Sequence, residues 1–204
     1  MKVLAENEAE ALLKKYVPVA KGIAVKKTVG FWKPPFILKI VSKKALHKSD
    51  IGGVRIVKNA EDAKDTYEAL VAIAKKRKLA PYSIIMQEYV QGVEMIIGIK
   101  SDPAFGHAIM LGTGGTLVEL IKDVSFRICP LTEKDASQMI EELKLKKLLY
   151  GFRGSANADV KALKKIIVKI SQIPKTHKIV EMDINPLIVA TKGAKVVDAR
   201  IVMS

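Results

Sequence analysis

The stretch FILKIVSKKALHKSDIGGVRIV, residues 36–57, contains two apolar segments separated by a polar loop. The first segment, Phe36–Val41, and the second, Val54–Val57, have the length and the branched aliphatic content of β-strands. The loop between them holds a lone histidine, His47, and ends in the pair Gly52-Gly53. Because glycine lets backbone N–H groups approach an anion closely, this pattern indicates a phosphate-binding loop between two strands.

Hydrophobic periodicity predicts helices and strands throughout the rest of the chain. Helical spacing occurs in residues 6–16, 60–77, 132–143 and 158–173, with Asn59 and Thr132 as the N-caps of the second and third helices. Strand patterns occur in residues 19–27, 83–90, 93–100, 105–111, 124–128, 179–184, 187–190 and 194–197. Because helices and strands do not alternate regularly, we expect an α+β fold with two lobes over a cleft, divided into residues 1–80 and 81–204.

The composition is that of a globular protein with an anionic partner or a well-solvated surface. Of the 204 residues, 49% are hydrophobic, which is ample for a core, and the net charge is +14. Nucleotide, CoA, an acidic subunit and nucleic acid all suit this charge. Only 5% of the residues are aromatic, and the basic residues are scattered or helical. Few aromatic side chains are therefore available for bases to stack on, and nucleic acid is the least favoured partner.

Neither a membrane span nor an oxidising compartment is expected from the sequence. The longest stretch without a charged residue, 103–118, is shorter than the roughly 20 residues that span a bilayer, and the N-terminus lacks the apolar core of a signal peptide. Cys129 is the sole cysteine, which excludes an internal disulfide and a cysteine-based zinc site. We therefore expect a cytoplasmic protein.

Polar oxygen ligands gather near the C-terminus. Asp183 and Asn185 are two residues apart, so on a strand they share one face, and Asp198 follows after a hairpin-like link. Such hard oxygen ligands suit Mg²⁺, which keeps waters and phosphates for the rest of its coordination shell. A polar strand end with Asn185-Pro186 as a turn explains the same residues without a metal, and spacing alone leaves both interpretations open.

Three blocks of the sequence together resemble one protein family. They are LKIVSKKALHKSDIGGVRI (38–56), QEYVQGVEMIIGIKSDPAFGHAIMLGTGGTLVELIKDVSFRICPLT (87–132), and VEMDINPLIV (180–189) with VVDARI (196–201). In this order they resemble the β subunit of ADP-forming acetyl-CoA synthetases, which are related to succinyl-CoA synthetase. The resemblance implies an ATP-grasp fold whose two lobes enclose a nucleotide cleft. The sequence departs from the family pattern before residue 36, where a further helix and its turn are missing or reduced. We therefore expect the N-terminal lobe to be shortened.

The resemblance assigns roles to the residues already noted. It implies Asn185 and Asp198 as ligands of Mg²⁺, with Asp183 beside them. It implies that His47, flanked by a lysine, is phosphorylated and relays a phosphoryl group to ADP, although a lone loop histidine is usually structural. Lys39 is either a snorkelling core lysine or a phosphate clamp, and the resemblance favours the clamp.

Further nucleotide contacts are implied around the link between two strands. In ATP-grasp folds this segment holds the adenine edge by its backbone and the ribose hydroxyls by a carboxylate, which points to Glu88, Tyr89, Val90 and Glu94. Gly52 and Gly53 complete the phosphate-binding set. Arg127 either neutralises phosphate charge or forms an ion pair with Asp123 or Glu119.

The family implies the reaction acyl-CoA + ADP + phosphate giving acid + ATP + CoA. This chain would supply the ATP/ADP half, with a CoA-binding α subunit as partner in a heterotetramer of two α and two β chains. Two alternatives stay open: another ATP-grasp carboxylate ligase that makes an acyl phosphate directly, and a non-catalytic module that binds nucleotide or nucleic acid. The acid used and the choice between ADP and GDP are not predicted.

Overall fold

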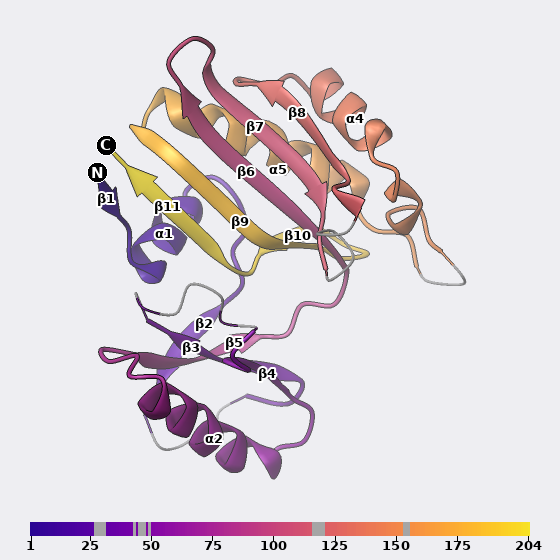
Figure 1. Ribbon diagram of the computed structural model, residues 1–204. Coiled ribbons are helices and arrows are strands. Elements are labelled where there is room, and N and C mark those ends of the chain that lie inside the picture. The colour runs from indigo at the N-terminus through magenta and orange to yellow at the C-terminus, as the bar shows by residue number, and fades with distance from the viewer. Residues whose placement is uncertain (27–31, 43, 45–47, 49, 116–120, 153–155) are drawn as a thin grey trace. The chain divides into compact units, whose positions relative to one another are not determined.

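The computed structural model describes all of residues 1–204 except 27–31, 43, 45–47, 49, 116–120 and 153–155 (Figure 1). The chain forms two compact units, one made of residues 1–19 and 90–204 and the other of residues 20–89. We call them the large unit and the small unit.

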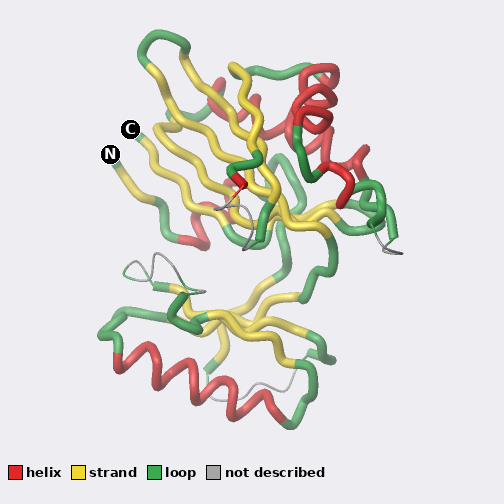
Figure 2. Tube along the Cα trace, turned by 45° about the vertical axis from the view of Figure 1, so that its right-hand side comes forward, coloured by secondary structure: helices red, strands yellow, loops and turns green. Residues whose placement is uncertain are grey.

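A twisted antiparallel sheet with helices on one face forms the large unit (Figures 1 and 2). Its strand order is β1 (Lys2–Val3), β11 (Ala199–Met203), β9 (Ile179–Val189), β6 (Val93–Asp102), β7 (Gly106–Thr113) and β8 (Val124–Ile128), and β10 (Ala194–Val196) also pairs with β9. The helices are α1 (Glu6–Leu13), α4 (Glu133–Glu142) and α5 (Val160–Gln172), with single 3₁₀ turns η1 (Lys146–Leu148) and η2 (Ile173–Lys175).

The core of the large unit lies between this sheet and its helices. Strand β6 alternates, so that Met95, Ile97 and Ile99 are buried in the core while Glu94 and Lys100 are exposed. Helix α5 contributes a stripe that includes Leu163 and other buried aliphatic residues at helical spacing. We call the opposite side, which carries Glu94, the open face of the sheet.

The small unit is a four-stranded antiparallel sheet packed against one helix. The strand order is β2 (Gly22–Val25), β5 (Ser83–Glu88), β3 (Phe36–Val41) and β4 (Val54–Val57), and the helix is α2 (Asp62–Lys76). Alternate residues of β3, among them Phe36 and Leu38, pack on Leu70 of α2 in a core separate from that of the large unit.

Most predicted elements are present, and three predictions are wrong. Asn59 does not cap α2, because the helix begins later, at Asp62, and the Asn59 amide instead donates to the Asp62 carboxylate at 3.1 Å. Residues 179–190 do not form two strands separated by a turn, because β9 continues through Asn185 and Pro186. The turn expected at Asn185-Pro186 is therefore absent.

The third difference concerns the boundary between the units. The sequence placed it at residue 80, but β5 pairs between β2 and β3 and therefore belongs to the small unit. Residues 1–19 belong to the large unit, because β1 pairs with β11 and α1 packs on the large core. The large unit is thus assembled from both ends of the chain.

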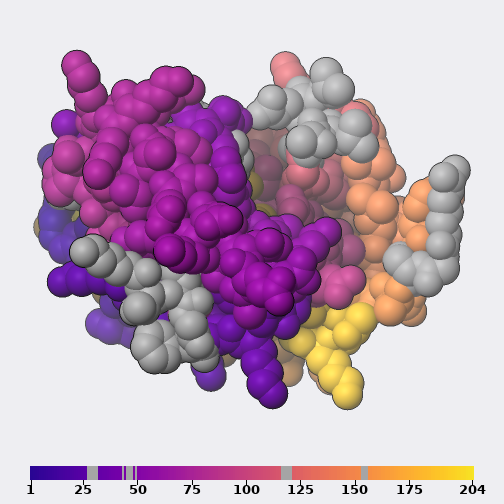
Figure 3. All heavy atoms as spheres, turned by 90° about the horizontal axis from the view of Figure 1, so that it is seen from below, coloured from indigo at the N-terminus to yellow at the C-terminus, as the bar shows by residue number. Residues whose placement is uncertain are grey.

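The basic run at the C-terminal end of α2 is a solvated surface. Residues 75–78 are all exposed, and the view in Figure 3 faces the side of the small unit on which α2 lies. Among the described residues, no helix is long and apolar enough to cross a membrane.

Candidate functional site

Three of the predicted metal ligands lie together on the large unit. Asp183 and Asn185 are exposed on the same side of β9, as the spacing predicted. Asp198 directly precedes β11, and its carbonyl accepts a hydrogen bond from the Asn185 backbone N–H at 3.1 Å. The pairing of β9 with β11 also places Arg200 opposite Asp183. Two strands therefore bring two carboxylates and one amide to the open face.

Negative charge is concentrated at this group. Desolvation raises the pKa of the Asp183 carboxyl above its usual range, and the nearby negative charges of Asp198 and Glu181 raise it further, while Arg200 lowers it. A divalent cation would relieve this repulsion, so the residues fit Mg²⁺. Among the described residues, no group of three or more His, Cys, Asp or Glu side chains could hold a metal ion. In general, Mg²⁺ keeps several waters and phosphate oxygens beside one or two protein carboxylates.

Glu94 lies on the same open face as these ligands. It is exposed at the beginning of β6, and its register partner on β9 is Ile188. The same pair of strands also aligns Gly98 with Asp183. The predicted ribose ligand and the predicted metal ligands therefore share one side of one sheet.

Lys39 is buried on the small unit, with 2% of its surface exposed. It alternates with Leu38 and Ile40, which pack toward α2, and so projects from the other side of the small sheet. Its register partner is Ile85, and the pairing of Ile37 with Gln87 makes buried Gln87 its diagonal neighbour. Burying an ammonium group is costly unless charge or hydrogen bonds compensate.

The glycine pair of the small unit is only partly available to an anion. The Gly53 N–H donates to the Lys48 carbonyl at 2.7 Å, and its own carbonyl accepts from Ile40 N–H at 2.8 Å. The predicted cradle therefore loses the Gly53 donor, which closes the loop instead. Gly52 has φ +68°, a conformation that glycine adopts readily. The predicted phosphohistidine, His47, lies outside the described residues, as does Glu119.

The segment predicted to hold the adenine edge is where the chain passes from one unit to the other. The boundary falls between Tyr89 and Val90. The Glu88 carboxylate accepts the Lys21 N–H at 2.7 Å, and the Glu88 N–H donates to the Lys21 carbonyl at 2.9 Å. Glu88 therefore anchors the start of this segment to the chain just before β2.

Arg127 lies on the opposite face of the large sheet from Asp183, Asn185 and Glu94, because its register partner on β7 is the core residue Ile109. It projects from β8 toward the helix-covered face and pairs with Glu142 of α4, with N–O distances of 2.5 and 3.1 Å. This ion pair lowers the pKa of Glu142 to about 2, chiefly through the hydrogen bond from Arg127, and raises the pKa of Arg127. An ion pair was one of the predicted roles of Arg127, and the partner that the structure shows is Glu142, not Asp123.

The sequence analysis missed the role of Asp123. Its carboxylate is 2% exposed and accepts the backbone N–H groups of Lys144 and Leu145 at 2.7 and 2.9 Å. It also accepts the hydroxyl of Thr113 at 3.2 Å. Asp123 therefore fixes the end of β7 to the turn after α4, a long-range link that no local pattern signals.

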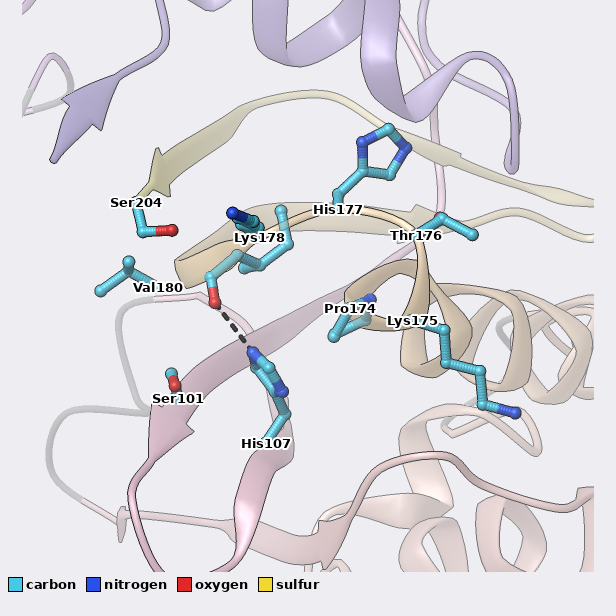
Figure 4. A pocket seen from close by; sticks show the side chains of 10 residues that line it. Ser101, His107, Pro174, Lys175, Thr176, His177, Lys178, Val180 and Ser204 are labelled. Carbon is cyan, nitrogen blue, oxygen red and sulfur yellow. Dashed lines mark hydrogen bonds between the residues drawn. The ribbon is translucent and has the colours of Figure 1, made fainter.

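A pocket of about 480 Å³ lies elsewhere on the large unit, and none of the predicted site residues line it (Figure 4). His107 lines it and bonds to the Ile179 carbonyl at 2.8 Å, while the ring of His177 bonds to the Tyr16 hydroxyl at 2.8 Å. In Figure 4 the side chains of Lys175 and Thr176 point away from its centre. Both histidines thus have hydrogen-bond partners within the large unit.

Comparison with known proteins agrees with these observations. A family model of the ATP-grasp domain matches residues 1–203. The β subunit of ADP-forming acetate–CoA ligase II from Pyrococcus furiosus is 39% identical, over 98% of this chain and 91% of that protein. ADP-forming acetate–CoA ligase II from Archaeoglobus fulgidus is also 39% identical over 98% of this chain, but the chain spans only 30% of its length.

Solved structures share the fold over the whole chain. Two structures of the dinucleotide forming acetyl-coenzyme A synthetase 1 of Ca. Korarchaeum cryptofilum align with the whole of this chain, at TM-scores of 0.87 and 0.82 and identities of 41% and 40%. The alignments cover 94% and 93% of those two chains. The first contains coenzyme A, Ca-AMPCP and HgCl⁺. The second contains coenzyme A and Mg-AMPPCP, with a phosphohistidine segment pointing towards the nucleotide binding site.

Proposed function

Since the chain belongs to the ATP-grasp family, and within it to the group that includes the β subunits of ADP-forming acetate–CoA ligases, we propose that it is the nucleotide-using part of an ADP-forming acyl-CoA synthetase. The reaction is acyl-CoA + ADP + phosphate giving acid + ATP + CoA. The observation that carries this proposal is the grouping of Asp183, Asn185, Asp198 and Glu94 on the open face of the large sheet. The CoA and acyl chemistry would belong to a partner subunit.

Asp183, Asn185 and Asp198 are the residues that would hold Mg²⁺. The ion would neutralise the charge of the nucleotide phosphates, which is the main electrostatic demand of phosphoryl transfer. Asn185 and Asp198 are held in register by the hydrogen bond between their backbones, so the oxygen ligands are preorganised by the sheet. Arg200, opposite Asp183, would orient its carboxylate and limit the local excess of negative charge.

The remaining residues bind nucleotide or carry the phosphoryl group. Glu94 accepts hydrogen bonds from the ribose hydroxyls, and the backbone of residues 88–90 contacts the adenine edge. Lys39 supplies a fixed positive charge for the phosphates, because its burial on the small sheet restricts its rotamers. His47 takes a phosphoryl group on one ring nitrogen from the partner subunit and passes it to ADP. In the second transfer a terminal phosphate oxygen of ADP forms the new O–P bond, the N–P bond breaks, and the ring nitrogen keeps its electron pair.

Reconstitution of the complete reaction tests this function. The chain is mixed with a CoA-binding α subunit, acyl-CoA, Mg-ADP and phosphate, and ATP formation is measured. We expect turnover only with both subunits, and at least about a thousandfold loss with His47→Ala, because no other group in the mechanism carries the phosphoryl intermediate. Substantial turnover by His47→Ala would instead support a ligase that makes the acyl phosphate directly.

The assembly and the compartment complete the proposal. We infer a heterotetramer of two α and two β chains, which light scattering of the mixed subunits would measure. A reducing cytoplasm suits a chain with a single cysteine, Cys129, whose half-buried thiol has its pKa raised to about 11 by burial.

A further inference from the structure

Two glycines hold the backbone of Glu94 from opposite sides. Gly92 lies two residues before Glu94 and faces the end of β9, while Gly114 follows the end of β7. The ladder between β6 and β7 ends at the pair Met95–Thr113, so Gly114 is the next residue toward Glu94. Its N–H donates to the Glu94 carbonyl at 2.7 Å.

The contact of Gly114 with Glu94 is closer than side chains allow. Directly opposite residues of an antiparallel pair ordinarily have Cβ atoms about 4.5–5.5 Å apart. A Cβ atom on Gly114 would lie 2.7 Å from the Glu94 Cβ and 2.9 Å from its backbone carbonyl carbon. Position 114 therefore admits only glycine without a shift of Glu94 itself.

Gly92 makes an equally close contact with β9. A Cβ atom there would lie 2.3 Å from the Val189 carbonyl oxygen and 2.6 Å from its carbon. Both of these are backbone atoms in a paired strand, so they cannot move aside as the end of a flexible side chain can. The three residues from Gly92 to Glu94 are thus fixed against β9 on one side and against the end of β7 on the other.

The second contact is itself anchored in the large unit. Thr113, next to Gly114, donates its hydroxyl to buried Asp123 and its backbone N–H to the Asp123 carbonyl at 3.3 Å. Gly115 has φ +94°, and a Cβ atom on it would lie 3.7 Å from the Glu94 carboxylate oxygen Oε2. The Glu94 carboxylate therefore lies beside Gly115, while its main-chain carbonyl is bonded to Gly114.

We propose that Gly92 and Gly114 are positioning residues that fix Glu94 for nucleotide binding. The inference rests on the proposed function, because it takes Glu94 as the acceptor for the ribose hydroxyls. A hydrogen-bond acceptor on an exposed side chain gains affinity when its backbone is rigid, since less freedom is lost on binding. Close backbone contacts that only glycine permits provide that rigidity here.

The test measures Mg-ADP affinity by calorimetry for the parent, Gly92→Ala, Gly114→Ala and Glu94→Gln, together with the thermal midpoint of each. We expect each glycine variant to bind Mg-ADP roughly tenfold more weakly, because small misplacements of a binding group are costly. In the Glu94→Gln background the same glycine substitutions should change affinity less than about twofold, since residues that act through one group are not additive.

Gly106→Ala is the matched control. Gly106 is at the far end of the β6–β7 hairpin, has φ +79° and would place a Cβ atom in open space. This substitution should lower stability through backbone strain while leaving Mg-ADP affinity unchanged. If Gly114→Ala does not fold, Thr113→Val provides a milder change at the same anchor and should weaken binding about threefold, again only when Glu94 is present.

The outcomes separate the inference from the function on which it rests. If Glu94→Gln binds Mg-ADP as the parent does, the assignment of Glu94 to nucleotide fails. Suppose instead that Glu94→Gln weakens Mg-ADP binding. If the folded glycine variants then bind Mg-ADP as the parent does, or if the glycine substitutions weaken binding equally in the parent and in Glu94→Gln, the positioning role is overturned and the nucleotide site stands.

Discussion

At the scale of single residues, the most informative side chains are charged groups with specific partners. Asp123 is a buried carboxylate whose backbone partners, Lys144 and Leu145, lie more than twenty residues away in sequence. From sequence it was considered only as an ion-pair partner for Arg127, because hydrogen bonds to distant backbone groups leave no local pattern. Lys39 was easier to single out from the sequence, since it is the one lysine in an otherwise apolar strand.

Replacing Asp123 by alanine should lower the free energy of unfolding by about 2–4 kcal/mol. The substitution removes a buried carboxylate and leaves the part-buried N–H groups of Lys144 and Leu145 without their acceptor, and such unsatisfied donors are expensive. Urea unfolding measures the change. Glu133→Ala, an exposed carboxylate at the start of α4, is the control and should change the value by less than about 0.5 kcal/mol. An equal effect of both substitutions would rule out the anchoring role of Asp123.

The pair Arg127–Glu142 gives a prediction about pH. The hydrogen bond from Arg127 lowers the pKa of Glu142 to about 2, below its ordinary value of about 4.3, so the ionised pair stabilises the fold above that ordinary value. This contribution is lost as the pH falls toward 2. An NMR titration of the Glu142 carboxyl should show a midpoint near 2 in the parent and a return toward the ordinary range in Arg127→Met. The same midpoint in both proteins would contradict the assigned cause.

At the scale of elements, local sequence patterns predicted helix starts and strand bounds, which depend on residues close together in the chain. The sequence Thr132-Glu133-Lys134-Asp135 predicted the start of α4, and the Thr132 hydroxyl indeed accepts the Asp135 N–H at 3.2 Å while Asp135 accepts the Thr132 N–H at 2.8 Å. Strands β3, β4 and β8 have the predicted bounds. β3 and β4 are short, mainly aliphatic segments, and β8 alternates apolar residues with Ser125 and Arg127.

Strand β9 shows where local signals mislead. Pro186 suggested a turn, since proline lacks the N–H that a strand ladder uses. The ladder with β11 ends at Ile184, and the ladder with β10 begins at Leu187. Pro186 therefore lies between two partners, where its missing donor is tolerated and the strand continues.

Removal of the α4 cap should cost a measurable part of the stability. Thr132→Ala is expected to lower the free energy of unfolding by about 1 kcal/mol, because one N-terminal N–H loses its acceptor. Denaturant titration measures this, and Thr132→Ser, which keeps the hydroxyl, should recover most of it. If serine and alanine are equally destabilising, the effect comes from packing and not from the cap.

At the scale of the whole molecule, the division into units could not be predicted from contiguous patterns. Residues 1–19 join the large unit through the pairing of β1 with β11 and through Ala9 and Leu13, both fully buried in the large core. Contacts between the two ends of the chain carry no local signature. The relationship of Asp183, Asn185 and Asp198 was predictable because it depends on strand alternation and on a recognised family pattern.

Leu13→Ala tests the discontinuous large unit. The substitution removes a fully buried side chain from the large core and should destabilise it by about 2–5 kcal/mol. Hydrogen exchange should then show reduced protection in β6 and β9, while β3 and β5 of the small unit keep theirs. Loss of protection confined to residues 20–89 would contradict the assignment of the N-terminal helix to the large unit.

The central claim, that His47 carries a phosphoryl group between a partner and a nucleotide, is tested most directly by intact mass. The parent and His47→Ala are each incubated with Mg-ATP and an α subunit, and the samples are kept away from acid because phosphohistidine is acid-labile. We predict a gain of roughly 80 Da on this chain in the parent only, with calorimetry showing that both proteins bind Mg-ATP. A parent that binds Mg-ATP and turns over with its partner without phosphate ever appearing on this chain, or an equal gain on His47→Ala, would contradict the claim.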